Sequence, residues 1–256
     1  MGLSRPRTSL TTGIQTGFQP NPFRKDGIMT SPIAIVVGAG GGLGQATAVT
    51  LHSAGYTTIG VDRNESGLGA LPPAIRREVA DATDPAVSKP LIDRIAREVG
   101  VPDVLVNTIG AYELGQSLTV TPETFKLMFE VNVGAALWLT QAVAPHMQRE
   151  GFGVIVHVGA RQGVEPSVGT AAYSMSKAAL VHLVRILDLE LQPHGIRVNA
   201  ILPQVIATEK NKALLPPEFL SNAVGPEALA RVIEFLVGDQ SGPVNGAVVP
   251  TYGGSA

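Results

Sequence analysis

Tyr173 and Lys177 are the residues whose types and spacing point most directly to chemistry. They lie four positions apart in Tyr173-Ser174-Met175-Ser176-Lys177, and one helical turn places both side chains on the same helix face. A phenol titrates near about pH 10 in water and is a poor acid–base group at neutral pH. A lysine ammonium one turn away favours the phenolate and lowers the tyrosine pKa toward neutrality. Taken alone, such a pair is more often a solvated helix face, so its interpretation depends on the rest of the chain.

A glycine-rich run provides a second candidate site, suited to a dinucleotide. The run Gly38-Ala39-Gly40-Gly41-Gly42-Leu43-Gly44 follows an apolar segment at 33–37 and precedes a helical pattern at 45–54. Glycines there leave room for a pyrophosphate over backbone N–H groups at the positive end of a helix. The strand before the run and the helix after it make this signal far more specific than glycines in an ordinary loop.

Asp62 ends the next apolar segment, 57–61, and follows Gly44 by 18 residues. A carboxylate at this place can accept hydrogen bonds from an adenosine ribose and would repel a 2′-phosphate. The adjacent Arg63 could accommodate that phosphate. We therefore expect NAD as the cofactor, with NADP as the alternative.

The elements that must position these residues alternate between short apolar strands and helices. Predicted strands lie at 33–37, 57–61, 76–80, 104–106, 153–158, 197–202 and 247–249. Predicted helices lie at 45–54, 90–99, 122–149, 173–192 and 227–236. Strands that are apolar on both faces and alternate with helices indicate a parallel sheet covered on both sides. The sequence predicts one doubly wound Rossmann-type α/β domain of about seven strands over residues 31–256.

Composition narrows the classes of partner. The net charge is −2 and 45% of the residues are hydrophobic, so the chain offers no electrostatic footprint for nucleic acid or an anionic membrane. It has no cysteine, which excludes thiol catalysis and thiolate metal sites. No apolar run reaches the roughly 18 residues needed to span a bilayer. We expect a cytoplasmic protein that acts on a small-molecule substrate.

Residues 1–30 differ from the rest of the chain. They are basic, poor in acids and rich in Ser, Thr, Gly and Pro, without the continuous apolar core of a secretory signal. We expect a disordered extension that precedes the domain, with Met29 as the functional start.

Several motifs in order resemble the short-chain dehydrogenase/reductase family over essentially all of residues 31–256. They are the glycine turn Gly38-x-x-x-Gly42-x-Gly44, Asp81, Asn107-Thr108-Ile109-Gly110, Asn132, Tyr173-x-x-x-Lys177 and Pro203 to Thr208. Thr108 and Ile109 depart from the family's Asn-Ala-Gly motif, and Gln204 and Tyr252 replace a usual glycine and acid.

The resemblance implies an NAD(P)-dependent oxidoreductase that transfers hydride between nicotinamide and a small carbonyl, alcohol or related substrate. It implies that Tyr173 is the general acid/base, that Lys177 lowers its pKa and holds the nicotinamide ribose, and that Asn132 organises a water relay. The implied cofactor contacts are Gly38, Gly42, Leu43, Gly44, Asp62, Arg63, Asp81, Asn107, Tyr173, Lys177 and Thr208. It further implies a homodimer or homotetramer formed through the helices at 122–149 and 173–192.

One family residue is missing. Ala160 lies thirteen residues before Tyr173, where the family has a serine that donates to the substrate oxygen, and a methyl group cannot donate. Losing one such donor typically costs about 10²–10³ in turnover. Three alternatives follow: the Gln162 amide replaces the hydroxyl, the substrate needs no serine, as in the related dihydropteridine reductases, or the protein is a non-catalytic dinucleotide sensor or scaffold. Ala160 and Gln162 are thus candidate substrate-site residues.

The five histidines are scattered without metal-ligand spacing and are interpreted as structural or surface residues, so we expect no metal site. His157 alone is placed in a strand that leads to the Ala160 loop. Arg161 and Glu165 line the predicted substrate loop, where charges are usually solvated.

Overall fold

The computed structural model describes residues 31–254, so the prediction for residues 1–30 lies outside the described part of the chain. Its centre is a parallel sheet of seven strands in the order β3-β2-β1-β4-β5-β6-β7. The strands are β1 (Ile33–Val37), β2 (Thr57–Asp62), β3 (Arg76–Val79), β4 (Val104–Asn107), β5 (Gly153–Val158), β6 (Ile196–Pro203) and β7 (Val248–Thr251). The predicted doubly wound α/β domain is confirmed, because the strand order reverses direction at β1, between β2 and β4.

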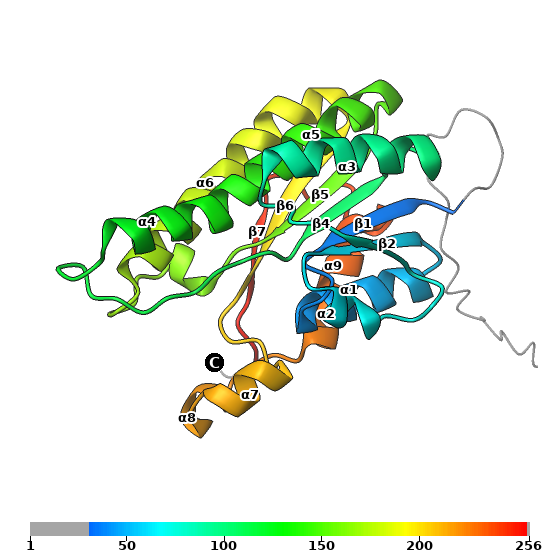
Figure 1. Cartoon of the computed structure of the whole chain (residues 1–256). Helices are drawn as coiled ribbons and strands as arrows, with labels where there is room; N and C mark the ends of the chain where they lie inside the picture. Colours follow the sequence, from blue (N-terminus) through cyan, green and yellow to red (C-terminus); the bar gives the residue numbers. More distant parts are fainter. Residues whose placement is uncertain (1–30, 255–256) are drawn as a thin grey trace, which may run out of the picture.

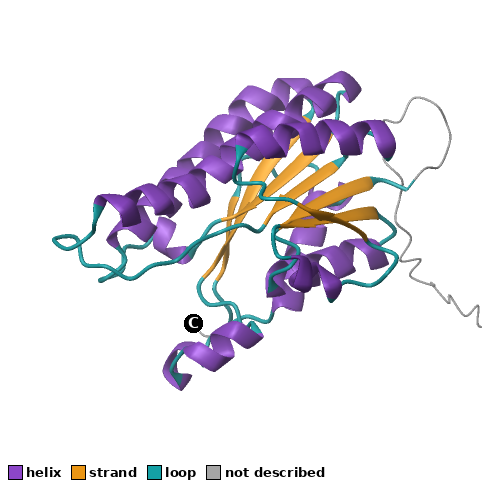
Figure 2. Cartoon of the chain, in the orientation of Figure 1, coloured by secondary structure: helices purple, strands orange, loops and turns teal. Residues whose placement is uncertain are grey.

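Helices cover both faces of the sheet (Figures 1 and 2). Helices α3 (Pro85–Glu98), α5 (Ala135–Glu150) and α6 (Ala171–Leu191) lie on one face, and α1 (Gly42–Ser53) and α9 (Pro226–Val237) lie on the other. The remaining helical segments are α2 (Glu65–Gly69), α4 (Pro122–Phe129), α7 (Glu209–Leu214), α8 (Pro217–Leu220), the π-helical turn η1 (Glu130–Gly134), and the 3₁₀ turns η2 (Arg161–Gly163), η3 (Gln192–His194) and η4 (Asp239–Ser241).

The core is divided between the two faces by the alternation of each strand. In β1, Ile33, Ile35 and Val37 join the cluster under α3, α5 and α6, whereas Ala34 and Val36 join the cluster under α1 and α9. All five side chains are buried. This explains why the strands read as continuous apolar runs rather than alternating ones.

Three predicted helix boundaries were wrong for local reasons. Helix α1 begins at Gly42 rather than at 45, because Gln45 N already donates to Gly41 O at 2.8 Å. Helix α3 begins at Pro85 rather than at 90, because the Asp84 side chain caps it by accepting from Ala86 N at 2.8 Å. The predicted helix at 122–149 is interrupted by the π-helical turn, which separates α4 from α5.

Candidate active site

The glycine turn between β1 and α1 has the form required to hold a phosphate. Gly38 has a φ of +86°, and a side chain at Gly44 would overlap the Gly38 carbonyl, so both positions need glycine. Helix α1 begins at Gly42 without a side-chain cap, which leaves its first backbone N–H groups free of a capping oxygen. An uncapped helix end behind a close-packed glycine turn fits a dinucleotide pyrophosphate, so the residues present are compatible with NAD(P).

Asp62 lies directly beside this turn. Its carboxylate oxygens accept from Gly40 N at 2.9 Å and from Asn64 N at 2.8 Å, and a Cβ at Gly40 would lie 2.9 Å from the Asp62 Cγ. Each carboxylate oxygen can accept more than one hydrogen bond. The predicted ribose acceptor and the predicted phosphate turn therefore form one continuous edge.

Arg63 and Asp81 lie at the same end of the sheet, after β2 and β3. The Arg63 guanidinium contacts the Asp81 carboxylate at 3.4 Å, and its side chain is 76% exposed. Asp81 also accepts from Thr83 Oγ1 at 2.6 Å. Hydrogen bonds from Thr83, together with Arg63, lower the pKa of Asp81. The Asp81 carboxylate therefore offsets part of the positive charge that Arg63 could offer to the 2′-phosphate of NADP.

Thr208 closes the other side of the glycine turn. A Cβ added to Gly42 would lie 2.8 Å from the Thr208 Cγ2 atom, so the two residues are in direct contact. The Thr208 hydroxyl caps α7 by accepting from Asn211 N at 3.2 Å. The structure therefore brings the predicted cofactor residue Thr208 against the predicted pyrophosphate site. Leu43, also predicted, is buried at the start of α1.

Asn107 and His157 form a buried polar layer beneath the site. The Asn107 side-chain Nδ2 lies 3.4 Å from His157 Nδ1, and Thr140 Oγ1 lies 3.2 Å from His157 Nε2. Asn107 Oδ1 accepts from Ile109 N at 3.0 Å, which fixes the turn after β4. Burial, with a smaller effect of the Lys177 charge, lowers the pKa of His157 to about 3. His157 is therefore a neutral positioning group in the core.

Lys177 is buried and anchored to the end of β5. Its Nζ donates to Val158 O at 2.8 Å, and a Cβ at Gly110 would lie 3.4 Å from the same Nζ. Burial lowers the pKa of Lys177 from 10.5 to about 8. The ammonium is thus held where β4 and β5 end, with most molecules still charged at neutral pH.

Tyr173 lies in the first turn of α6 and is mostly buried. Its ring packs edge-on against Tyr112, with centroids 4.8 Å apart. Burial, followed by the proximity of Tyr112, raises the pKa of Tyr173 above its ordinary value of 10. This direction is opposite to the predicted lowering by Lys177. The reason is that the phenolate is desolvated at this largely buried position, while the Lys177 ammonium faces the Val158 carbonyl.

Asn132 occupies the middle of the π-helical turn, a form of backbone that is frequent at functional sites. Its side chain donates to Ser176 Oγ at 2.9 Å and to Ala111 O at 3.0 Å, and it accepts from Ala111 N at 2.9 Å. Ser176 in turn donates to Tyr173 O at 2.7 Å. The Asn132 side chain therefore binds the Ala111 loop to α6. Sequence reasoning gave no role to the buried Ser176, although it stands directly before Lys177.

Ala160, at the position of the family's serine, is 3% exposed and precedes the 3₁₀ turn η2. Gln162 lies in η2 and is half-buried. A Cβ at Gly163 would lie 2.8 Å from the Lys177 backbone oxygen, so η2 packs closely on α6. The two candidate substrate residues are thus beside the Tyr173–Lys177 turn.

Sequence reasoning treated Arg161 as a solvated charge, but the structure gives it several partners. Its guanidinium donates to Gln204 Oε1 at 2.9 Å and to Glu165 Oε2 at 2.7 Å. The Arg161 Cζ atom also lies 4.7 Å from the centroid of the Tyr252 ring. Gln204 and Tyr252 are two positions at which the sequence departs from the family motifs. The sequence shows that these two residue types are unusual for the family, but it does not show that both side chains contact Arg161.

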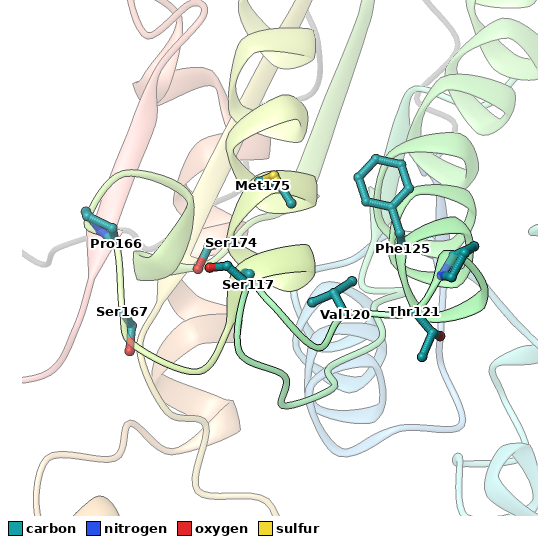
Figure 3. A pocket seen from close by; sticks show the side chains of 10 residues that line it. Ser117, Val120, Thr121, Phe125, Pro166, Ser167, Ser174 and Met175 are labelled. Atoms are coloured by element: carbon teal, nitrogen blue, oxygen red, sulfur yellow. The ribbon is translucent and has the colours of Figure 1, made fainter.

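A pocket of about 690 Å³ lies between the loop before α4, the start of α4 and the first turn of α6 (Figure 3). It is lined by Ser117 and Val120 of the loop before α4, by Phe125 of α4, and by Ser174 and Met175 of α6. None of the predicted catalytic or cofactor residues lines it. The pocket is therefore lined by other residues than the Tyr173–Lys177 pair.

Two properties of residues 31–254 bear on metal binding and on membrane insertion. No group of three or more His, Asp or Glu side chains there could hold a metal ion. The helical stretch Pro122–Glu150 is long and apolar enough to cross a membrane, but half of its most apolar window is buried inside the protein. A core helix that covers a sheet has the same composition, so this stretch is weak evidence for a membrane span.

Comparisons with known proteins agree with the geometry. The family described as short chain dehydrogenase matches residues 32–218. Human L-xylulose reductase is 33% identical over 234 residues, covering 86% of this chain and 94% of that protein. A solved structure of NAD⁺-bound xylitol dehydrogenase superposes with a TM-score of 0.80 at 26% identity, covering 87% of this chain and 98% of the other. ElxO with NADP bound, at 21% identity and a TM-score of 0.82 over 88% of this chain and 98% of the other, shares the fold.

Proposed function

The chain belongs to the short-chain dehydrogenase family and is an NAD(P)-dependent oxidoreductase, and from this premise we propose that Tyr173 is its general acid/base. The substrate is a small molecule whose carbonyl is reduced or whose alcohol is oxidised, and the preferred cofactor is NAD. The observation that carries the proposal is the placement of Lys177. Its ammonium is buried one helical turn from Tyr173 and fixed to Val158 O at the carboxyl end of β5.

The residues divide the work by position. The glycine turn and the uncapped start of α1 hold the pyrophosphate, and Asp62 accepts from the adenosine ribose. When bound, the nicotinamide supplies the hydride for reduction or accepts it in oxidation. Tyr173 donates its phenolic proton to the carbonyl oxygen as that oxygen becomes an alkoxide. Lys177 holds the nicotinamide ribose, and Asn132 holds the Ala111 loop on α6 through Ser176.

The raised pKa of Tyr173 fits a role as the proton donor in reduction. A phenol is already protonated at neutral pH, and burial raises its pKa further, so the residue begins reduction as a proton donor. Alcohol oxidation requires the phenolate first, which this environment disfavours. The positive charge of Lys177, whose pKa is about 8, is present at neutral pH and is lost as the pH rises above about 8.

Preference for NAD over NADP is supported by the place of Asp62. Its carboxylate lies against Gly40, where a ribose 2′-phosphate would meet a negative charge. Arg63 is paired with Asp81 and largely exposed, so it offsets that repulsion poorly. The preference predicts a lower KM for NADH than for NADPH, and the replacement Asp62→Ala should narrow the difference.

A second candidate activity is reduction of a quinonoid dihydropteridine, which is favoured by Ala160. Such a substrate does not need a serine donor, and the buried methyl of Ala160 offers none.

A homo-oligomer in the cytoplasm is also proposed. Exposed apolar side chains on α4 and α6, including Phe125, Leu127 and Leu189, provide surface that association would cover.

The test is a screen of NADH and NADPH oxidation over ketones, quinones and quinonoid pterins, run with Tyr173→Phe and the matched control Tyr112→Phe. Tyr173→Phe should abolish turnover while NADH still binds, because the ring remains and only the hydroxyl is removed. Tyr112→Phe keeps the ring that packs against Tyr173 and should remain within a few-fold of the parent. Full turnover by Tyr173→Phe would refute the assignment. Ala160→Ser should raise ketone reduction by about 10²–10³ if the hydroxyl is limiting.

A further inference from the structure

Arg161 connects the carboxyl ends of three neighbouring strands. It follows the end of β5 by three residues, Gln204 directly follows β6, and Tyr252 directly follows β7. Strands β5, β6 and β7 are adjacent in the sheet. In open α/β sheets, ligands bind outside the carboxyl ends of the strands. The Arg161 guanidinium therefore lies on the edge where a substrate must enter, next to the buried Ala160.

The three contacts of Arg161 differ in kind. Gln204 accepts one N–H on the Nη1 side at 2.9 Å, and the Tyr252 ring lies under the guanidinium at 4.7 Å. These two neutral partners orient the group without cancelling its charge. Glu165 takes the opposite edge, with its Oε2 at 2.7 Å from both Nε and Nη2. A carboxylate can bind this edge by two parallel hydrogen bonds, one to each nitrogen.

The contact with Glu165 is the exchangeable one. The Arg161 side chain is 37% exposed and the Glu165 side chain is 50% exposed. An ion pair so open to solvent adds little to stability, because water screens both charges. A carboxylate from outside can thus replace Glu165 at small cost, while Gln204 and Tyr252 keep the guanidinium in place. Glu165 then acts as an internal substitute for the anionic group of a substrate.

We propose that Arg161 is a specificity-determining residue that binds a carboxylate of the substrate, and that Glu165 holds this site when the substrate is absent. The inference rests on the proposed function and names its substrate class: oxo acids, or the corresponding hydroxy acids, with the reacting carbon close to the carboxylate. It also explains why Gln204 and Tyr252 replace the usual glycine and acid of the family motifs, since both side chains orient the guanidinium.

The test compares charged substrates with neutral partners of similar shape. Pyruvate, acetoacetate and levulinate, each beside its methyl ester, are offered to the NADH-loaded enzyme and to Arg161→Gln and Glu165→Gln. Arg161→Gln should raise KM for the preferred acid on the order of 10- to 100-fold, the loss expected for hydrogen bonds to a charged group. It should also lower kcat for the acid, because the guanidinium helps to orient the carbonyl, and it should change both constants for the ester little. Glu165→Gln should lower KM for the acid, because the competing carboxylate is removed.

Arg231→Gln, which removes an equally charged but exposed side chain on α9, controls for net charge and should leave both constants unchanged. Equal losses for acid and ester in Arg161→Gln, or a raised KM for the acid in Glu165→Gln, would overturn the inference. If no substrate is turned over, calorimetry with levulinate on the NAD⁺-loaded enzyme decides it separately. Binding that is lost only in Arg161→Gln supports the anion site and counts against the proposed activity, whereas equal or absent binding in all variants refutes the anion site.

Discussion

Replacing Lys177 by methionine should change the way stability depends on pH, in a direction fixed by the burial of the ammonium. Each pKa unit corresponds to about 1.4 kcal/mol, so lowering the Lys177 pKa from 10.5 to about 8 means that the charged form costs roughly 3 kcal/mol of folding free energy at neutral pH. Between the two pKa values the unfolded chain binds the proton and the folded chain does not, so stability rises with pH in that window.

The expected result is a difference between two pH profiles. From about pH 7 to about pH 9.5, the free energy of unfolding of the parent should rise by about 2 kcal/mol relative to Lys177→Met. A single pH is ambiguous, because the variant also leaves Val158 O without its Lys177 donor, and an unsatisfied buried carbonyl costs about 1–3 kcal/mol. That loss does not titrate and cancels from the slope.

Urea unfolding followed by circular dichroism across the pH series measures the slope. Lys210→Met, at an exposed position in α7, is the matched control and should follow the parent profile. Parallel profiles for the parent and Lys177→Met would show that the Lys177 pKa is not lowered in the folded state. Such a result would refute the argument that this ammonium is buried and held by a single carbonyl.

Two further predictions concern His157 and the glycine turn. Because the pKa of His157 is lowered to about 3, only the unfolded chain binds a proton at this ring between its usual pKa and about 3. Acidification to about pH 5 should therefore destabilise the parent by about 2 kcal/mol relative to His157→Gln in urea unfolding. Equal acid sensitivity of the two proteins would contradict the burial of this ring. Gly44→Ala should weaken NADH binding more than tenfold, because its methyl would overlap Gly38 O, whereas Gly41→Ala, with its nearest contact at an ordinary 3.4 Å, should bind nearly as the parent in a fluorescence titration. Similar affinities in the two alanine variants would show that close packing of the turn does not govern cofactor binding.

The fold could be predicted because its signals are local and repeated. Each central strand is a continuous apolar run, and each is followed by a helix of ordinary length, which leaves a parallel sheet as the arrangement that buries both faces. Helix ends were less predictable, since they depend on single hydrogen bonds. The Asp84 cap that starts α3 five residues earlier than expected is one such bond, and the Pro at position 90 was a misleading signal.

The residues of the candidate site could be predicted from the sequence, but their pKa values could not. Tyr173, Lys177, Asp62 and the glycine turn could be recognised from spacing, because each motif lies within one element or one turn. The pKa of Tyr173 could not, because it depends on burial and on Tyr112, which lies 61 positions earlier in the chain. The direction in which Lys177 points is likewise set by a carbonyl on another strand.

The partners of Arg161 lie on other elements of the fold, so the sequence alone did not show that this side chain is held in place. With Ala160 in place of the family's serine, the site lacks a neutral donor to the reacting oxygen. Arg161, the next residue, places a charged donor on the same carboxyl edge of the sheet, farther from the reacting oxygen. Binding energy from a group remote from the reaction can still accelerate it, when that energy is used to orient the substrate against Tyr173. A carboxylate held at Arg161 leaves a nearby carbonyl few orientations, which compensates in part for the missing serine. On this argument Ala160→Ser and Arg161→Gln should be coupled: the added hydroxyl should help neutral ketones more than oxo acids, whose orientation the guanidinium has already fixed.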